Sequence, residues 1–260
     1  AYDTLGPGRH IIIELKPTAF NMGEYVVTAQ YSPQRADKSI YKVKVIGAKQ
    51  IVQKGATNLA EIFTNELGIR LDQSGVFGTN LSIRGLGGEN LKVLIDGVPV
   101  IGRLDGNLDL GQMNINNADH IEMVEGPMSV IYGSNALAGV VNIITKENKN
   151  VPVSANVNGY YESVGTYNIN GAVSVSRKRN IIGISGGRNF FDGYSLNPEL
   201  RTMYWKPKRQ YNIDGYYVYN HPKFKIKYAH QYFNEYMLDK GDIIEPHFAR
   251  DNHLTTVRFN

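Results

Sequence analysis

Hydrophobic and polar positions are spaced differently before and after residue 150, and the change predicts two kinds of structure. Residues 41–146 contain short apolar runs of mixed spacing, which are typical of a small α+β domain. Beyond Val151, apolar and polar residues alternate over segments of roughly ten residues, as in β-strands with one apolar face. The chain is therefore predicted to join a compact mixed domain to a set of long antiparallel strands.

The mixed region begins with a predicted strand and a predicted helix. "YKVKVIGA" (41–48) alternates like a strand. In "TNLAEIFTNELG" (57–68), Thr57 or Asn58 is available as the helix cap and Gly68 as the stop. The apolar residues at helical spacing are Leu59, Ile62, Phe63 and Leu67. This pattern predicts one helix across most of residues 57–68.

Glycine turns divide the rest of this region. "NLSIRGLGGENLKVLIDGVPV" (80–100) predicts a strand, a glycine-rich turn, a second strand and a turn at Asp96-Gly97, and "HIEMVEG" (120–126) predicts another strand. In "GPMSVIYGSNALAGVVNIITK" (126–146), Pro127 suits the first position of a short helix and Gly133 the residue just past its end. A β-branched run follows, in which Asn142 separates two apolar pairs. Roughly five short strands and two or three short helices are expected in total.

The alternating segments of the second region separate an apolar face from a polar one. They are "VSANVNGYYES" (153–163), "TYNINGAVSVS" (166–176), "YNIDGYYVYN" (211–220) and "KFKIKYAHQYFNE" (223–235). The residues predicted to face lipid include Val157, Ile169 and Phe224, and those predicted to face a lumen include Asn156, Asn168 and Lys225.

Connections in the second region differ in length. They are tight at "SVG" (163–165), "RKRN" (177–180) and "YNHPK" (219–223), and long at residues 192–210 and 237–252. Short periplasmic turns and longer external loops are typical of outer-membrane β-barrels, so the long loops are expected outside and the short turns inside. A soluble sandwich with one solvated face is the alternative interpretation.

Composition narrows the class of protein. The 260 residues carry 28 Lys and Arg against 24 Asp and Glu, a net charge of +4 that is too diffuse to indicate a nucleic-acid partner. The absence of cysteine excludes a disulfide framework, a thiol nucleophile and a cysteine metal site. Of the 17 tyrosines, 12 lie between Tyr160 and Tyr236, which favours a sheet at a boundary between water and an apolar phase.

Two long segments in the mixed region resemble a known family. Residues 80–100 followed by residues 120–146 resemble the plug domain of TonB-dependent outer-membrane receptors, and "EYVVTAQ" (24–30) resembles the TonB box that precedes such plugs. The resemblance covers residues 21–146 in detail. The remaining residues share only the general pattern of alternating apolar and polar positions. It implies a plug that fills a large barrel, of the size whose lumen is plugged in outer-membrane transporters.

The resemblance implies a division of the chain into four parts. Residues 1–20 would be the end of an N-terminal β-sandwich-like extension, 21–40 the TonB box and linker, 41–148 the plug, and 149–260 the first strands of the outer-membrane β-barrel, about six in number. The implied fold is mixed: a small α+β plug followed by antiparallel transmembrane strands. The barrel would be incomplete, because six strands cannot enclose a plug and an open edge is not tolerated in lipid.

The implied function is uptake of a scarce nutrient complex across the bacterial outer membrane, energised through TonB. "EGPMSVIYG" departs from the carbohydrate-importing branch and resembles importers of ferric siderophores, haem or cobalamin. The implied partners are outer-membrane lipid, a small-molecule or metal-chelate substrate, and the TonB C-terminal domain, and the box that pairs with TonB by strand addition comprises Glu24, Tyr25, Val26, Val27, Thr28 and Ala29. No enzyme activity, cofactor or nucleic-acid partner is implied. A non-transporting adhesin or signalling sensor on the same scaffold is the alternative.

The plug pattern also implies where the ligand binds. The expected ligand-binding residues at the plug apex are Arg84, Asn90, Arg103, Asp105 and Asn107. Arg84 matches one of two plug arginines of the family, whereas Glu125 stands where the family commonly has the other. The charge balance therefore differs from the family pattern, and an Arg84–Glu125 pair within the plug is one arrangement that would satisfy it.

Other motifs are weaker. "GLGGEN" (85–90) lacks the third glycine of a dinucleotide fingerprint and is not followed by a long helix. A metal or haem site in an outer loop would draw on Asp239, Asp242, His247, Asp251 and His253. Their spacing matches no compact metal site, so a solvated loop is the preferred interpretation and no metal site is assigned.

Overall fold

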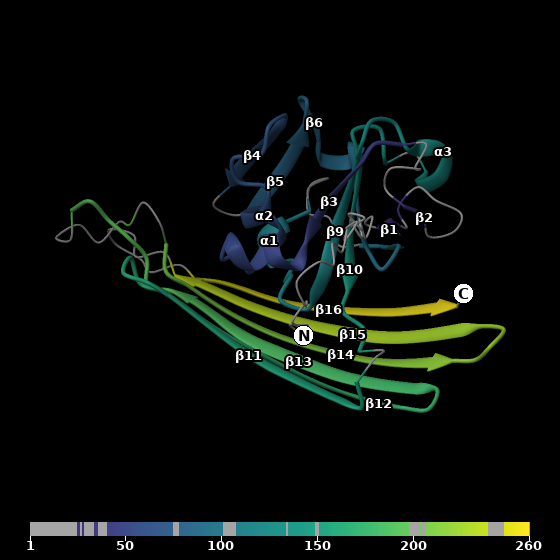
Figure 1. Ribbon diagram of the computed structural model, residues 1–260. Coiled ribbons are helices and arrows are strands. Elements are labelled where there is room, and N and C mark those ends of the chain that lie inside the picture. Colours follow the sequence, from purple (N-terminus) through teal and green to yellow (C-terminus); the bar gives the residue numbers. More distant parts are fainter. Residues whose placement is uncertain are drawn as a thin grey trace, which may run out of the picture.

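The computed structural model describes residues 25–26, 28, 34–35, 41–74, 78–100, 108–133, 135–148, 151–197, 203, 206–238 and 247–259. The predicted extension at residues 1–20 lies outside this part of the chain. The described residues form a mixed domain that lies against one face of a curved sheet of long strands (Figure 1). Here the mixed domain is called the plug and the sheet of long strands the wall.

The plug contains short strands, short helices and two 3-10 turns. In chain order they are β1 (Tyr25–Val26), β2 (Gln34–Arg35), β3 (Val43–Gly47), α1 (Ala48–Gln53), α2 (Leu59–Ile62), β4 (Ile69–Ser74), β5 (Gly78–Ile83), β6 (Leu86–Gly87), η2 (Gly88–Asn90), β7 (Leu91–Ile95), β8 (Val98–Pro99), η3 (Leu110–Gln112), β9 (Ala118–Glu125), α3 (Ser129–Tyr132) and β10 (Gly139–Thr145). The expectation of roughly five strands between residues 41 and 146 is too low, because the described residues form eight there.

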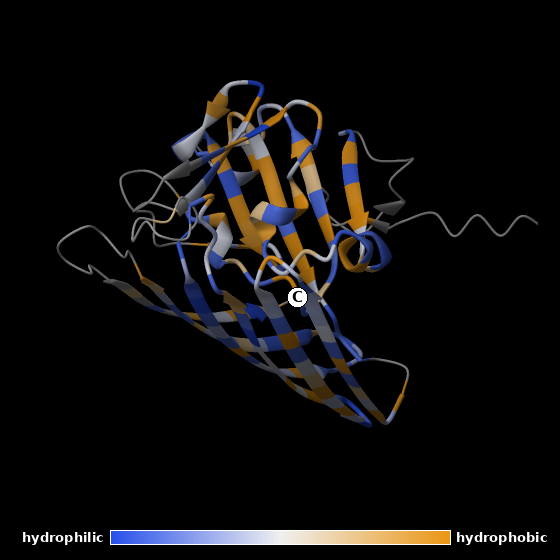
Figure 2. Cartoon of the chain, turned by 90° about the vertical axis from the view of Figure 1, so that its left-hand side faces the viewer, coloured by the Kyte–Doolittle hydropathy of each residue, from blue (hydrophilic) through white to orange (hydrophobic). Residues whose placement is uncertain are grey.

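The central strand of the plug is β10. The main sheet has the order β3-β9-β10-β7-β8, with β10 antiparallel to β9 and parallel to β7. Flanked on both sides, β10 buries Gly139 to Ile143, as its β-branched run predicts. Gly139 is required at its start, because a Cβ there would lie 2.3 Å from the carbonyl oxygen of Val124 and its φ is +150°. Figure 2 shows the hydrophobic residues concentrated on these central strands.

Two helix predictions need correction. Asn58 caps α2, accepting from the Glu61 N–H at 3.1 Å, but the helix ends at Ile62 because Asn65 adopts a left-handed conformation with φ +64°. Leu67 is consequently 95% exposed instead of sharing the apolar face. Helix α3 begins at Ser129, so Pro127 precedes its first turn, whereas Gly133 follows its last residue with φ +87° as predicted.

The wall is one antiparallel sheet of six strands in sequence order. They are β11 (Val153–Glu162), β12 (Thr166–Arg177), β13 (Asn180–Phe191), β14 (Lys208–Asn220), β15 (Lys225–Leu238) and β16 (His247–Phe259). Among the described strands, β11 and β16 form the two edges, so the barrel is not closed. None of the helices in the described part of the chain is long and apolar enough to cross a membrane.

The two faces of the wall carry the predicted residues. Val157 and Ile169 are 76% and 57% exposed on the face turned away from the plug, whereas Asn168 is buried on the inner face. Lys225 also lies on the inner face, where it pairs with the plug residue Glu147. The alternation in the sequence is therefore confirmed, with the polar residues on the plug side.

The ends of the wall differ from the prediction in two respects. The tight turn at residues 163–165 lies at the same end as the long connection after β13, because the Asp192 N–H donates to the Gly165 carbonyl at 3.0 Å. Strand β16 begins at His247, so His247, Asp251 and His253 belong to a strand and not to an outer loop. Within the described residues, no three His, Asp or Glu side chains are grouped as metal ligands.

Candidate functional site at the plug–wall junction

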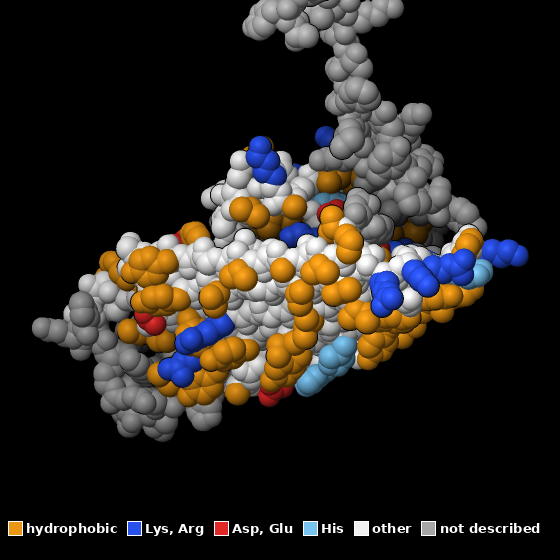
Figure 3. Space-filling view, turned by 60° about the horizontal axis from the view of Figure 1, so that its bottom comes forward, with side chains coloured by type: hydrophobic (Ala, Val, Ile, Leu, Met, Phe, Trp, Pro, Cys, Tyr) orange, Lys and Arg blue, Asp and Glu red, His pale blue; other side chains and the backbone are white. Residues whose placement is uncertain are grey.

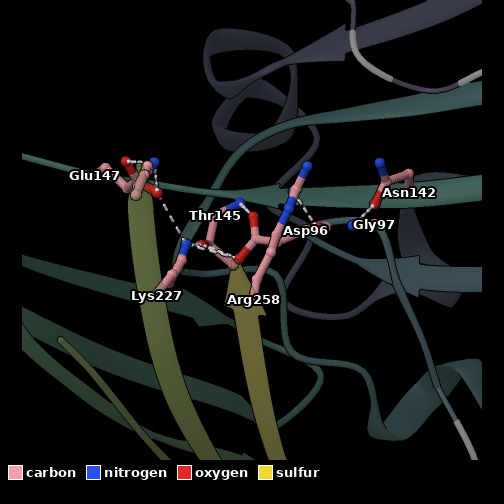
Figure 4. A network of polar contacts seen from close by, with 8 residues as sticks. Asp96, Gly97, Asn142, Thr145, Glu147, Lys227 and Arg258 are labelled. Atoms are coloured by element: carbon pink, nitrogen blue, oxygen red, sulfur yellow. Dashed lines mark hydrogen bonds and ion pairs between the residues drawn. The ribbon is translucent and has the colours of Figure 1, made fainter. Parts of the chain in front are cut away.

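The plug and the wall are joined by a cluster of opposite charges (Figure 4). Asp96 occupies the turn after β7 in a left-handed conformation with φ +50°, and its carboxylate accepts from the Thr145 N–H at 2.9 Å and the Thr145 hydroxyl at 2.8 Å. Lys227 of β15 places its Nζ 2.7 Å from the Asp96 carboxylate. The side chains of Lys227 and Asp96 are only 6% and 12% exposed, so each charge depends on the other for compensation.

Further charges reinforce this contact. Glu147, just past β10, lies 2.7 Å from Lys225 and 3.3 Å from Lys227, and Arg258 of β16 donates to the Asp96 carbonyl. The plug thus contributes the acidic groups and the wall the basic ones. The cavity among these side chains measures about 30 Å³, room for roughly one or two waters, and the ion pairs around it hold the plug against the wall.

A polar path leads from this junction into the plug. The Gly97 N–H donates to Asn142 Oδ1 at 3.0 Å, and Asn142 Nδ2 donates in turn to the hydroxyl of Thr28 at 3.0 Å. Asn142 and Thr28 are 1% and 0% exposed. Asn142 is the polar residue between two apolar pairs of β10, and its role in the structure is to hold a segment 114 positions earlier in the chain.

Glu122 holds the same segment from the neighbouring strand. Asn142 and Glu122 are direct partners across β10 and β9, and Glu122 Oε2 accepts from the Thr28 N–H at 2.6 Å. The second carboxylate oxygen lies 3.0 Å from His120 Nε2. Burial disfavours protonation of the His120 ring, but hydrogen bonds to Glu122 and Asp119 outweigh it and raise the pKa of His120. We call Asn142, Glu122 and His120 the clamp.

The predicted site residues fall into three groups. Thr28 is held by the clamp, Tyr25 and Val26 form β1, and Glu24, Val27 and Ala29 lie outside the described residues. Arg84 lies in the turn between β5 and β6 and pairs with Glu125 at 2.9 Å, the arrangement considered from the sequence. Arg103, Asp105 and Asn107 lie outside the described part of the chain.

Asn90 has a structural role in this fold. Its side-chain Nδ2 donates to the Gly87 carbonyl at 3.2 Å, and its own carbonyl accepts from the Ala138 N–H at 2.9 Å. Both contacts position the start of β7. Arg84, in contrast, keeps a side chain that is 78% exposed.

The clamp and the charged junction are features of the candidate site that the sequence analysis did not predict. Asn142 and Glu122 each interrupt a buried β-branched or apolar run, and a single polar residue in two consecutive buried strands is the signal that could have found them. The junction has a weaker signal, because Lys225 and Lys227 look like an ordinary polar face until the plug is placed beside them.

Comparisons with known proteins agree with this architecture. Residues 35–140 match the family model described as the TonB-dependent Receptor Plug Domain. The vitamin B12 transporter BtuB of Vibrio cholerae serotype O1 is 35% identical over 123 residues, which cover 46% of this chain and 20% of that protein.

Solved structures share the fold beyond the plug. The ferric yersiniabactin uptake receptor FyuA from Yersinia pestis superposes with a TM-score of 0.72 at 16% identity, covering 84% of this chain and 38% of that one. The siderophore receptor PirA from Acinetobacter baumannii superposes with a TM-score of 0.64 at 20% identity, covering 80% and 33%. The chain thus spans about a third of the solved structures that it matches.

A plug seated on antiparallel barrel strands defines the class. Residues 35–140 are similar to the plug domain of TonB-dependent receptors, and the plug together with the wall has the fold of solved outer-membrane uptake receptors.

Proposed function

We propose that this receptor imports a scarce nutrient complex, such as a ferric siderophore, haem or cobalamin, across the bacterial outer membrane with energy supplied through TonB. The relatives named as vitamin B12 and siderophore receptors support a chelate or cobalamin cargo. The outward apolar face of the wall supports a position in lipid, since Val157 and Ile169 are largely exposed there.

The observation that carries the proposal is the buried position of Thr28. Strand addition to TonB requires free backbone donors and acceptors in Glu24–Ala29, but the Thr28 N–H is already bound to Glu122. The segment must therefore leave the clamp before it can pair with TonB. Release of residues 24–29 from the clamp would make them available to TonB. Their availability in the periplasm would then report the state of the plug.

The polar path supports a route for that signal. Asn142 contacts both Thr28 and the turn that carries Asp96, so a shift of that turn alters the hold on Thr28. Strand β7 (Leu91–Ile95) connects Asn90, just before it, with Asp96 at the junction, just after it, and this supports a ligand site at the end of the plug away from the junction. We place the ligand contacts at Arg84, Asn90, Arg103, Asp105 and Asn107, with the Arg103 guanidinium binding an anionic group of the cargo.

The box assignment is tested by removing one backbone donor. Val27→Pro in the full-length receptor should abolish uptake and leave surface binding of the cargo intact, because proline lacks the N–H that strand addition uses. Val27→Ala is the matched control and should transport normally. Normal uptake by Val27→Pro would remove residues 24–29 from the role of TonB box.

The clamp is tested separately with Thr28→Val, which keeps the shape of the side chain and removes the acceptor for Asn142. In the absence of cargo, this variant should expose the segment to protease faster than the parent and should bind TonB more readily. Asn116→Leu, which breaks a plug–wall contact with Asn170 at 2.6 Å, is the control and should leave exposure of the segment unchanged.

The ligand site is tested with Arg103→Ala. Binding of the cargo at the surface should weaken, while expression and TonB binding stay as in the parent. A titration that superposes on the parent curve would exclude Arg103 as a ligand contact and direct the search to the outer loops.

A further inference from the structure

We propose that the outward face of β13 and β14 binds the phosphate group of an outer-leaflet lipid through Arg188 and Arg209. The two arginines lie diagonally across adjacent strands, because Arg188 pairs with Tyr211 and Phe190 pairs with Arg209. The proposal rests on the proposed function only for the assignment of the membrane and its outer side.

The two guanidinium groups share one aromatic ring. The Arg188 Cζ lies 3.5 Å from the centroid of the Phe190 ring, and the Arg209 Cζ lies 5.9 Å from it. Phe190 is itself held edge-on by Tyr211, with ring centroids 5.4 Å apart. Stacking on a fixed ring limits the freedom of both guanidinium groups, which lowers the entropic cost of binding an anion with them.

Both positive charges are available to a ligand. Neither Arg188 nor Arg209 forms an ion pair within the described residues, and both side chains are exposed. Their surroundings are apolar: Ile169 and Ile213 are 57% and 52% exposed on the same face. Figure 3 shows basic side chains lying among hydrophobic ones on this face of the wall. An anion that binds here must therefore tolerate an apolar environment, as a lipid does.

The position of the two arginines along their strands matches the depth expected for a lipid headgroup. Arg188 lies near the end of β13 and Arg209 near the start of β14, next to the long connection between them. In the proposed orientation this is the outer end of the wall. Arginine on the lipid face costs ~2–4 kcal/mol at the bilayer midplane but only ~0–1 kcal/mol near an interface, so the pair is tolerated at this height.

A groove beside the pair provides room for the rest of the lipid headgroup. It measures about 390 Å³ and is lined by Tyr167, Ile169, Arg188 and Phe190, with Asp192 at its polar side. The Asp192 carboxylate accepts a hydrogen bond from the Tyr167 hydroxyl. Because this carboxylate repels an anion, we place the phosphate on the side of Phe190 that faces Arg209, with the apolar part of the lipid along Ile169 and Ile213.

The test measures lipid binding by the full-length receptor in detergent, using native mass spectrometry with titrated lipid A, the bisphosphorylated glucosamine lipid. Arg188→Gln combined with Arg209→Gln should weaken lipid A binding by roughly tenfold or more, as expected for the loss of charge-assisted hydrogen bonds. Arg177→Gln combined with Lys178→Gln, in the turn at the opposite end of β13, is the matched control and should bind as the parent does.

Additional binding measurements identify the molecule that supplies the phosphate. Dephosphorylated lipid A should bind the parent weakly and should not distinguish the variants, and inorganic phosphate should not displace lipid A. Heat-modifiable migration in gels checks that each variant is folded, and Arg209→Gln alone serves if the double variant is not. Equal affinity of parent and variant for lipid A would overturn the proposal, as would displacement by inorganic phosphate or preferential binding of an acidic peptide.

The outcome is independent of transport. Val27→Pro should bind lipid A as the parent does, because the outward face of β13 and β14 is remote from the segment that pairs with TonB. A receptor that failed the uptake test could therefore still pass the lipid test, and the two failures are distinguishable.

Discussion

The plug and the wall use opposite arrangements of the same residue types. The plug buries its isoleucines, valines and leucines, including Ile121 and Val140 at 0% exposure. The wall exposes its own, including Ile182 at 59%, and buries amides such as Gln210 at 2% and Asn212 at 3%. The plug therefore has an apolar interior, as water-soluble domains do. The wall has the reverse arrangement, with apolar residues on its outward face and amides on its covered face.

This difference explains why charges gather where the two parts meet. The inner face of the wall is polar and needs hydrogen-bond partners once the plug covers it. The turn at Asp96 and the segment at Glu147 supply them to Lys225 and Lys227. The junction therefore holds the plug through paired, largely buried charges.

The largest expected effect comes from breaking the buried charge pair. Lys227→Met should destabilise the plug–wall assembly by ~3–5 kcal/mol, because it leaves the Asp96 carboxylate buried without its cation. Arg70→Ala, which breaks an exposed pair with Asp72 at 2.8 Å, is the control and should cost ~0–1 kcal/mol. The thermal midpoint of the full-length receptor in detergent measures both, and equal midpoints would contradict a holding role for the junction.

The next effect tests which face of the wall meets lipid. Val157→Arg places a charge on the outward face and should cost ~2–4 kcal/mol at mid-membrane depth, so little folded receptor should reach the membrane. Its neighbour Asn158 is also exposed on β11 but lies on the inner face, and Asn158→Arg should assemble well. Equal assembly, measured by heat-modifiable migration, would favour a soluble sheet or a shifted register.

A smaller effect is expected within the plug. Asn58→Ala removes the side-chain acceptor for the Glu61 N–H and should destabilise the plug by ~1 kcal/mol, within the range of helix caps. Asn58→Asp keeps an acceptor at the same place and should cost less than alanine does. Chemical denaturation followed by circular dichroism compares the two, and an alanine variant as stable as the aspartate variant would argue against the cap.

The smallest effect is a pH dependence of the clamp. Because the pKa of His120 is raised in the folded protein, its charged contacts with Glu122 and Asp119 stabilise the clamp fully below the ordinary value of about 6.5. That contribution is lost as the pH rises through the raised pKa. Protease cleavage of the segment around Thr28 should therefore accelerate between neutral and mildly alkaline pH, and His120→Asn should flatten this dependence. A parent profile without any slope would contradict the link.

The alternation of apolar and polar residues correctly predicted the faces of the wall strands. Alternation along 153–175 placed Asn168 and Ile169 on the correct faces, because strand period is independent of what lies on either side. The helix at 57–68 was predicted too long, because apolar spacing continues to Leu67 while the backbone turns at Asn65. The candidate ligand site stays a prediction. Of its described members, Arg84 is exposed, and Asn90 also supports the backbone at the start of β7.

What the sequence determined by itself is the division into two parts, the class of each and the family motifs, since these depend on short-range periodicity and local glycine geometry. Only the tertiary structure decided the partners of the buried charges. Thr28 and Asn142 are 114 positions apart, and Asp96 and Lys227 come from different parts of the fold. The physical reason is that a buried polar residue in an apolar strand requires a hydrogen-bond partner, and the sequence shows this requirement. The identity of the partner depends on which distant segment the packing brings within hydrogen-bond distance.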